Sequence, residues 1–464
     1  MAASTRNTSE TDAKSSQASV HHISDGHRAA SAIRVFAPGG YTNLNTGDGL
    51  LLIALNEALK RVFGDDVMPT YLTTTPELDR AALGLDVEAY LMSRYGRFMR
   101  FGGALARRVG ARGGVVYLGI GWGWIALMRS WLVVERLSPR LANSLLPQPI
   151  LERIRALRAS DAVVSVPGGY FLSPTALDAA WLNHWIELSL AVMLSRPTVL
   201  GPCSLGPFHG PQRKLMRWLF ERVDGIALRE GESEAHVRGT GYRGPLIRTT
   251  DAGFGVDLLP PGGASNVPTD RPLIGVSVRW FHFAGSPDPA AAQHAYFQSV
   301  ADAVSALIGD GGGAVFVPQV RAAADDDIAA AREVVALMPS ASRARVSVKE
   351  ENVTPYEAAA LYASFDLLIG TRMHANIISM LVGTPAVAIA YEHKTTGIMN
   401  ELGLDDLVID IAQCNADALL TRSRAILRDR PAASHRVQTA AFAARTRLEI
   451  WETALRSIIG TGRS

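Results

Sequence analysis

Short apolar runs alternate with longer amphipathic runs along most of this chain. The run Ile33-Arg-Val-Phe36 predicts a first strand, and the periodic apolar positions from Leu50 to Val62 predict the helix after it. Strands that alternate with helices are typical of a doubly wound parallel sheet, in which ligands bind beyond the carboxyl ends of the strands. The same alternation predicts further strands over 161–166, 198–200 and 225–228, and helices over 176–194 and 211–221.

The alternation breaks between Asp251 and Asp270 and then resumes. Pro, Gly, Asn and Ser dominate the break, and such a composition resists regular structure. A chain of 464 residues is also too long for one ordinary core. We therefore predict an α/β protein with two Rossmann-like domains, over 32–255 and 270–464, that face one cleft. Strands of the second domain are predicted over 273–278, 314–317, 366–369 and 385–389, and helices over 294–308 and 376–381.

Two segments do not follow this alternation. Residues 1–31 are rich in Ser, Thr, Ala and His and lack the apolar core of a secretory signal, so we predict a disordered tail. Residues 84–150 place six arginines, between 94 and 112, ahead of three tryptophans, and we predict a helical insertion there. Two interpretations stay open for it: a packing element with solvated arginines, which we favour, or a surface that touches a membrane. The tryptophans are Trp122, Trp124 and Trp131.

The composition excludes several classes of protein. Lys and Arg number 46 against 44 Asp and Glu, and the net charge of +2 gives no reason to expect a nucleic-acid partner. Cys203 and Cys414 are far apart and in no metal-binding spacing, which argues against a zinc site and a disulfide framework. We therefore predict a protein of a reducing compartment, the cytoplasm.

The densest group of chemical side chains surrounds Arg372 and His374. The buried run Asp366 to Ile369 ends in a Gly-Thr turn, so both side chains are predicted at the mouth of the cleft, near helix amides that favour an anion. Arginine grips a carboxylate or phosphate in a bidentate manner, and histidine changes its charge near neutral pH. The alternative is an arginine that caps the helix and a histidine satisfied by a backbone carbonyl.

Three further cations follow predicted strands. Arg229 comes after 225–228, Arg279 after 273–278, and Lys394 shortly after 385–389. With Arg372 they would present four cations to one cleft, which predicts an anionic donor with more than one charge. The alternative is that each pairs with a neighbouring acid such as Glu230 or, for Lys394, that it is an ordinary surface charge.

Glycine-rich turns follow two strands of the first domain. One, of the form GG-x2-N-x3-GD, contains Asn43 and Asp48, and the other contains Gly168 and Gly169. Because small residues let the backbone approach a ligand closely, we predict that these four residues bind substrate. The alternative is that the glycines serve only tight packing.

These motifs together resemble the polysaccharide pyruvyl transferase family, from about residue 34 to residue 405. The specific part is Ile369-Gly-Thr-Arg-Met-His374, followed by Gly383-Thr-Pro385 and Tyr391-x2-Lys394. The resemblance also includes Gly40-Tyr41-x-Asn43-x3-Gly47-Asp48, Pro167-Gly168-Gly169, Leu228-Arg229-Glu230-x2-Ser233 and Asp251-Ala-Gly-Phe254. One departure is Gln319, which stands where many members of the family carry His.

The resemblance implies a fold like that of the GT-B glycosyltransferases, with phosphoenolpyruvate as donor and a sugar diol as acceptor. Arg372, His374 and Arg229 would hold and activate the donor. His374 as imidazolium would protonate the donor's methylene carbon, while the arginines and Lys394 neutralise its phosphate and carboxylate. A cyclic ketal would form on a cell-surface glycan or its lipid-linked precursor, without a cofactor or metal.

Two other classes stay open. A conventional GT-B glycosyltransferase that uses a nucleotide sugar would have the same cleft. A non-catalytic sugar- or anion-binding protein would also keep the fold, but the presence of Arg372, His374 and Lys394 argues against it.

Overall fold

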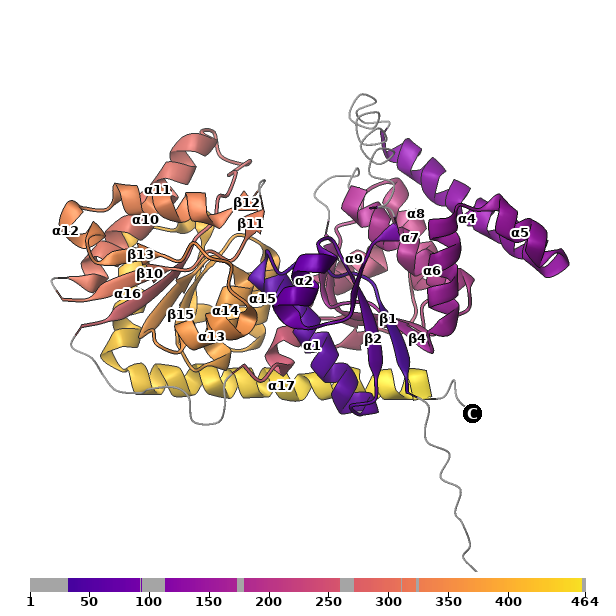
Figure 1. Cartoon of the computed structure of the whole chain (residues 1–464). Coiled ribbons are helices and arrows are strands. Elements are labelled where there is room, and N and C mark those ends of the chain that lie inside the picture. Colours follow the sequence, from indigo (N-terminus) through magenta and orange to yellow (C-terminus); the bar gives the residue numbers. More distant parts are fainter. Residues whose placement is uncertain are drawn as a thin grey trace, which may run out of the picture. The chain divides into compact units, whose positions relative to one another are not determined.

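Two parallel sheets organise the chain (Figure 1). The computed structural model describes residues 32–91, 93, 113–172, 179–258, 271–309, 311–322 and 325–460. The predicted tail, the arginine-rich stretch 94–112 and the part of the predicted break over 259–270 lie outside these residues. The described part of residues 33–464 belongs to one compact unit.

The first sheet has eight strands in the order β3-β2-β1-β4-β6-β7-β8, with β5 paired to β6. Its neighbouring strands are parallel. The strands are β1 (Arg34–Ala37), β2 (Met68–Thr73), β3 (Val87–Ala89), β4 (Ala162–Val164), β5 (Gly168–Phe171), β6 (Thr198–Leu205), β7 (Gly225–Leu228) and β8 (Ile247–Arg248). The helices around it are α1 (Thr46–Phe63), α2 (Pro76–Leu83), α4 (Gly113–Leu137), α5 (Pro139–Leu145), α6 (Gln148–Ala159), α7 (Ala179–Met193), α8 (Pro211–Phe220), α9 (Glu232–Gly239) and the 3-10 turn η3 (Ala252–Gly255).

The second sheet has six parallel strands in the order β13-β10-β9-β14-β15-β16. They are β9 (Leu273–Ser277), β10 (Gly313–Phe316), β13 (Val346–Val348), β14 (Leu367–Gly370), β15 (Ala386–Ala390) and β16 (Val408–Asp410). An antiparallel pair, β11 (Arg321–Ala322) and β12 (Asp325–Asp326), lies outside the sheet. The helices are α10 (Pro289–Ile308), α11 (Asp327–Leu337), α12 (Ser340–Arg343), α13 (Pro355–Tyr362), α14 (Met373–Leu381), α15 (His393–Glu401), α16 (Ala416–Arg428) and α17 (Arg430–Gly460), with short turns η4 (Asp405–Leu407) and η5 (Ile411–Gln413).

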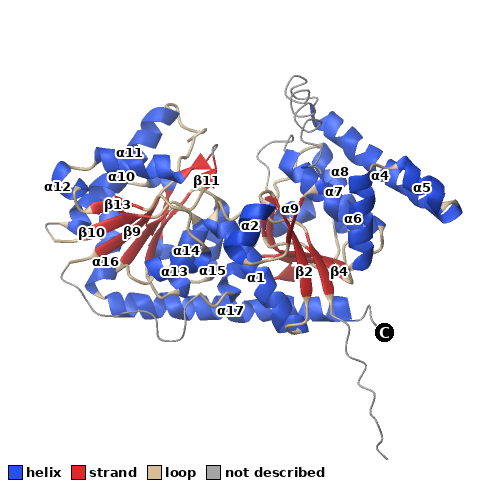
Figure 2. Ribbon diagram, in the orientation of Figure 1, coloured by secondary structure: helices blue, strands red, loops and turns tan. Residues whose placement is uncertain are grey.

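Helices cover both faces of each sheet (Figure 2), and this explains the apolar runs in the sequence. Every residue of β6, β14 and β15 is buried. A strand covered on both faces has no solvent-facing positions, so its sequence is continuously apolar rather than alternating. The predicted α/β layering is therefore confirmed in both halves.

Three local predictions were wrong in detail. Helix α1 begins at Thr46 rather than Leu50, because the side chain of Asn45 accepts a hydrogen bond from the Gly47 amide and caps the helix. Gly168 and Gly169 lie in strand β5 rather than in a turn. Helix α14 begins at Met373, three residues before the predicted start, so Arg372 is its N-cap residue.

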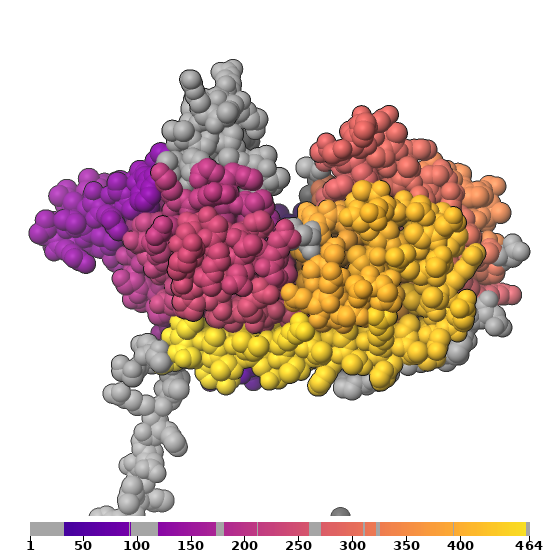
Figure 3. All heavy atoms as spheres, turned by 180° about the vertical axis from the view of Figure 1, so that it is seen from behind, coloured from indigo at the N-terminus to yellow at the C-terminus, as the bar shows by residue number. Residues whose placement is uncertain are grey.

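The last helix joins the two halves. Helix α17 contacts α14 in the second half and α1, η3, β7 and β8 in the first. Figure 3 shows its yellow atoms running from the second half onto the magenta part of the first. Its Trp451 is buried and belongs to a core that contains residues of both sheets. Among the described residues, no helix is both long and apolar enough to cross a membrane.

Candidate active site

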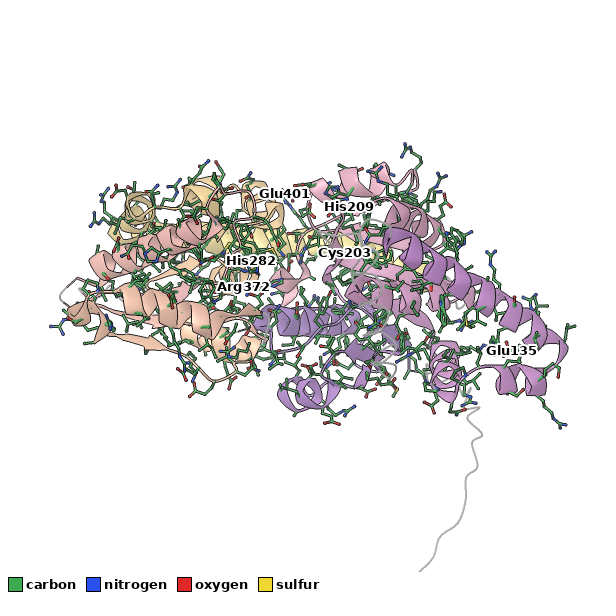
Figure 4. All side chains as sticks on the ribbon, turned by 90° about the horizontal axis from the view of Figure 1, so that it is seen from above. Glu135, Cys203, His209, His282, Arg372 and Glu401 are labelled. Atoms are coloured by element: carbon green, nitrogen blue, oxygen red, sulfur yellow. The ribbon has the colours of Figure 1, made fainter. Side chains whose placement is uncertain are left out.

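A cavity of about 310 Å³ lies where the carboxyl ends of strands from both sheets meet. Its lining contains every predicted cation together with His374, Asp48 and Gly169. Figure 4 shows Arg372 on the side of the second half that faces the first. The full lining is Tyr41, Asn45, Asp48, Leu51, Gly169, Leu172, Arg229, Arg279, Gln319, Arg372, Met373, His374, Tyr391, Glu392 and Lys394.

His374, Asp251 and Arg229 lie next to one another where the two halves meet. The His374 Nε2 atom lies 3.7 Å from Asp251 Oδ2, beyond hydrogen-bond length, and the same oxygen accepts a 2.7 Å hydrogen bond from Arg229 Nη1. Arg229 Nε also donates to Ser204 Oγ at 2.8 Å. Burial raises the pKa of Asp251, but Arg229, His374 and the Gly253 amide together lower it well below its usual range, so the carboxylate is ionised at neutral pH.

Burial also sets the charge of His374. It lowers the pKa of the imidazole below its ordinary value, although the Asp251 carboxylate raises it in part. His374 is therefore largely neutral at pH 7 as long as no donor is bound. Nε2 is buried and lies toward Asp251, so a substrate would have to reach this ring at Nδ1.

The first turn of α1 packs directly on this imidazole. A Cβ atom built on Gly47 would lie 2.1 Å from His374 Nδ1, so any larger side chain there would displace the ring. Backbone hydrogen bonds fix the turn to the second half, since Thr46 N donates to Gln319 O and Arg321 N donates to Leu44 O, each at 2.9 Å. The glycine in the GD motif thus has a packing role.

Arg372 is held by two acids that the sequence did not assign to the site. Its Nε and Nη2 atoms donate to the buried carboxylate of Asp327 at 3.0 and 2.6 Å, and Nη2 lies 2.8 Å from Asp325 Oδ1. Among the described residues, its Nη1 atom has no such partner. The guanidinium of Arg372 lines the cavity, but its charge is largely neutralised by these two carboxylates. The sequence analysis predicted an unpaired arginine that grips an anion, and the structure corrects this prediction.

Arg279 and Lys394 both lie close to the ring of Tyr391. The Arg279 Cζ atom is 4.3 Å, and the Lys394 Nζ atom 5.9 Å, from the centre of the Tyr391 ring. Arg279 Nη2 is also 3.3 Å from Asp325, and Lys394 Nζ is 2.5 Å from Glu392. Asp325 and Glu392 are partly exposed, so each ion pair is weak and an incoming anion can take the place of the carboxylate.

Asp48 is an acid among these cations. It is the third residue of α1 and lines the cavity. Burial raises its pKa to about 7, although Lys394, Arg229 and Arg372 lower it. A carboxyl group with this pKa can both accept and donate a proton near neutral pH.

The predicted glycine-loop residues divide into two groups. Gly169 and Asp48 line the main cavity, and Gly168 lines a small hollow next to it. Asn43 is fully buried outside the lining, and its side-chain amide has no hydrogen-bond partner among the described residues. Its Oδ1 atom would be 2.2 Å from a Cβ atom on Gly49, so it packs against α1. The structure thus does not bring Asn43 to the other site residues.

The sequence analysis assigned no role to Tyr391, which lines the cavity, or to three aspartates that contact lining residues. Asp325 and Asp327 belong to the acidic triplet 325–327, which was a visible signal, whereas Tyr391 and Asp251 appeared in motifs without a role. Gln319 Nε2 donates to Tyr362 Oη at 2.7 Å, while its Oε1 atom has no partner among the described residues. No cluster of three or more metal-binding side chains occurs in the described part of the chain.

Comparisons with known proteins point to one family. A family model described as polysaccharide pyruvyl transferase matches residues 45–393. The match includes Asp48, Arg229, Arg279, Arg372 and His374. The chain is similar to the amylovoran biosynthesis protein AmsJ of Erwinia amylovora, at 27% identity over 298 residues, 61% of this chain and 70% of that protein.

A similar solved structure supports the fold. A Listeria monocytogenes protein assigned as UDP-N-acetylglucosamine 2-epimerase aligns with a TM-score of 0.51 at 11% identity, over 89% of this chain and 94% of its own. At this identity the likeness concerns the fold alone. With the two parallel sheets, it confirms the predicted GT-B-like fold.

Proposed function

Because the chain belongs to the polysaccharide pyruvyl transferase family, we propose that it moves the pyruvyl group of phosphoenolpyruvate to a sugar diol and forms a cyclic ketal. The chain is a transferase of polysaccharide biosynthesis, a role that the similarity to AmsJ also supports. The acceptor in this proposal is a cell-surface glycan or its lipid-linked precursor. The observation that carries the proposal is the cavity that groups four cations with His374 and Asp48.

Donor binding in this scheme is an exchange of anions. Phosphoenolpyruvate carries a phosphate and a carboxylate, and Arg279 and Lys394 would release Asp325 and Glu392 to bind them. Arg229 stays paired with the buried Asp251, and Arg372 with Asp327, so these two arginines contribute positive potential from fixed positions. No metal or cofactor takes part in the scheme.

Proton transfer begins at His374. The negative charge of the donor raises the pKa of the imidazole, which then carries a proton on Nδ1 and gives it to the methylene carbon. The Asp251 carboxylate, 3.7 Å from Nε2, stabilises the imidazolium by its negative charge. The donor carbon becomes a methyl group, and the neighbouring central carbon becomes electrophilic.

Two hydroxyl groups of the acceptor then complete the ketal. The first attacks the central carbon and loses its proton to Asp48, whose pKa of about 7 suits a general base. Phosphate leaves with the electrons of its C–O bond, and the second hydroxyl adds to the same carbon and loses its proton to His374, which the first step left neutral. The pyruvyl carboxylate remains on the glycan.

A cytoplasmic location completes the proposal. It rests on the two cysteines, of which Cys203 is buried and neither forms a disulfide. Contact with the inner face of the membrane would bring the enzyme to a lipid-linked acceptor.

The decisive experiment is phosphate release from phosphoenolpyruvate by the purified protein, with and without galactose-, glucose- and mannose-containing acceptors. Acceptor-dependent release, with a ketal methyl signal in the NMR spectrum of the product, is the expected result. No release with any acceptor, together with binding of a nucleotide sugar, would instead assign the cleft to a GT-B glycosyltransferase.

A further inference from the structure

Exposed apolar side chains concentrate on one pair of helices far from the cavity lining. Among the described residues, twelve large apolar side chains are exposed, and six of them lie between residues 122 and 145. Leu137 is the most exposed of all, at 81%. Single exposed apolar residues are ordinary, but a group of this kind marks an interaction surface. The six are Trp122, Leu127, Val133, Leu137, Leu141 and Leu145.

Helical geometry places three of these residues on one face of α4, and α5 follows directly after it. Trp122, Val133 and Leu137 are eleven and four residues apart on α4, a spacing that puts them on one face. Leu141 and Leu145 are four residues apart on α5, which packs on α4 through a hydrogen bond from Trp131 Nε1 to Ala142 O at 2.8 Å. Both helices lie on the outer side of the first half (Figure 1, Figure 4).

The charged residues on this surface have one sign. Arg129 and Arg136, seven and fourteen residues after Trp122, follow the edge of the apolar stripe and are exposed, as is Arg140 on α5. The acid of this region, Glu135, points to the other side, where it pairs with Arg158 of α6. The neighbouring helix α8, whose Leu215 packs on Gly121, exposes Arg213 and Lys214.

We propose that the α4–α5 surface, defined by these apolar residues and arginines, docks on an anionic lipid bilayer. Apolar side chains enter the headgroup region while arginines at their edge bind lipid phosphates, the arrangement of helices that lie in the plane of a membrane. The all-basic edge favours this occupant over a second copy of the chain, since two such edges would repel each other. This inference goes beyond the proposed chemistry, which does not use these residues.

The test is flotation of the full chain with vesicles. We expect binding to vesicles of phosphatidylcholine and phosphatidylglycerol, weaker binding at high salt, and none to phosphatidylcholine alone. The double variant Leu137→Ser/Leu141→Ser should lose at least about tenfold in binding, and Arg129→Glu/Arg136→Glu a similar factor. Because all four side chains are exposed, thermal melting should be unchanged.

Matched controls come from the opposite end of the chain. Phe442→Ser/Ile450→Ser removes two exposed apolar side chains of α17, and Arg424→Glu/Arg428→Glu reverses two exposed charges of α16. Both controls should bind vesicles like the parent chain. Equal binding by the leucine variant and the parent, or no binding by the parent, overturns the proposal. So does a parent dimer that fails to float and that the leucine variant converts to a monomer.

Discussion

At the scale of single residues, His374 is the group on which the proposed chemistry depends. It lines the cavity, and its Nε2 atom lies 3.7 Å from Asp251 Oδ2. We expect His374→Asn to reduce acceptor-dependent phosphate release by about 100-fold or more, because the proton donor to carbon is lost. His435→Asn on the exposed face of α17 is the control and should leave the rate unchanged. A normal rate in the first variant, measured with correctly folded protein, would remove His374 from the mechanism.

A second histidine controls stability in acid. His184 of α7 is buried among the rings of Tyr41, Tyr90 and Tyr170, with centroids 5.1 Å away in each case. Burial lowers its pKa to about 3, so the folded protein binds fewer protons than the unfolded chain as the pH falls below 6.5. Stability from this group is present above pH 6.5 and is lost progressively as the pH falls toward 3.

This linkage predicts a measurable acid effect. Between pH 7 and pH 5, His184 should reduce the free energy of unfolding by about 2 kcal/mol. Urea unfolding of the parent and of His184→Phe at both pH values measures it, since the variant cannot take up the proton. If both proteins lost the same free energy of unfolding between pH 7 and pH 5, His184 would not have the lowered pKa that this prediction requires.

At the scale of elements, Arg372 joins the β14–α14 junction to the start of α11. Its partner Asp327 is fully buried and also accepts hydrogen bonds from the backbone amides of Gln319 and Val320. We expect Arg372→Ala to destabilise the fold by about 3 to 5 kcal/mol, because it leaves a buried carboxylate without its counterion. Arg279→Ala should cost less than about 1 kcal/mol, since its partner Asp325 is partly exposed.

Substitution of Arg372 should therefore mainly affect stability, and substitution of Arg279 should mainly affect donor binding. Thermal melting should fall in Arg372→Ala and hardly change in Arg279→Ala, whereas the KM for phosphoenolpyruvate should rise in Arg279→Ala. If Arg279→Ala kept the parent KM, the exchange of Asp325 for the donor would be wrong.

The contact between α1 and α14 gives another test. Gly47→Ala places a methyl group 2.1 Å from the original position of His374 Nδ1, so the imidazole must move and turnover should fall at least about tenfold. Gly239→Ala on α9 is the matched control, because its Cβ atom would meet nothing within 4 Å. Equal rates in both variants would mean that the ring position does not limit catalysis.

The positions of strands and helices could be predicted from the sequence more accurately than the ion pairs between distant residues. Buried strands such as β14 have a continuous apolar run, so the positions of Arg229, Arg279 and Arg372 at strand ends could be predicted. Gly168 and Gly169 could not be placed in a strand, because their composition is typical of turns. Asp327 precedes its partner Arg372 by 45 residues, and Asp251 precedes His374 by 123 residues. A local sequence pattern carries no information about contacts between residues so far apart in the chain.

At the scale of the whole molecule, the site is complete only where the two halves meet. Asp48, Arg229 and Asp251 come from the first half, and Arg279, Arg372, His374 and Lys394 from the second. Helix α17 and the backbone hydrogen bonds between Thr46 and Gln319 connect these halves. The charge balance of the cavity is thus a property of the whole fold, and a donor that adds negative charge must change it.

That change should appear as proton uptake. A bound trianionic or dianionic donor raises the pKa values of His374 and Asp48, and both groups are mostly deprotonated above pH 7.5. Calorimetric titration with phosphoenolpyruvate at pH 8, in two buffers with different ionisation enthalpies, should therefore give different heats that correspond to uptake of up to about one proton. Asp48→Asn should reduce the proton uptake. It should also keep the affinity for phosphoenolpyruvate within about tenfold, because the Asp48 carboxylate repels the negative donor and its removal takes away no attraction. Identical heats in both buffers would mean that the donor leaves both groups in their original state, and the proton for the methylene carbon would then have to come from elsewhere.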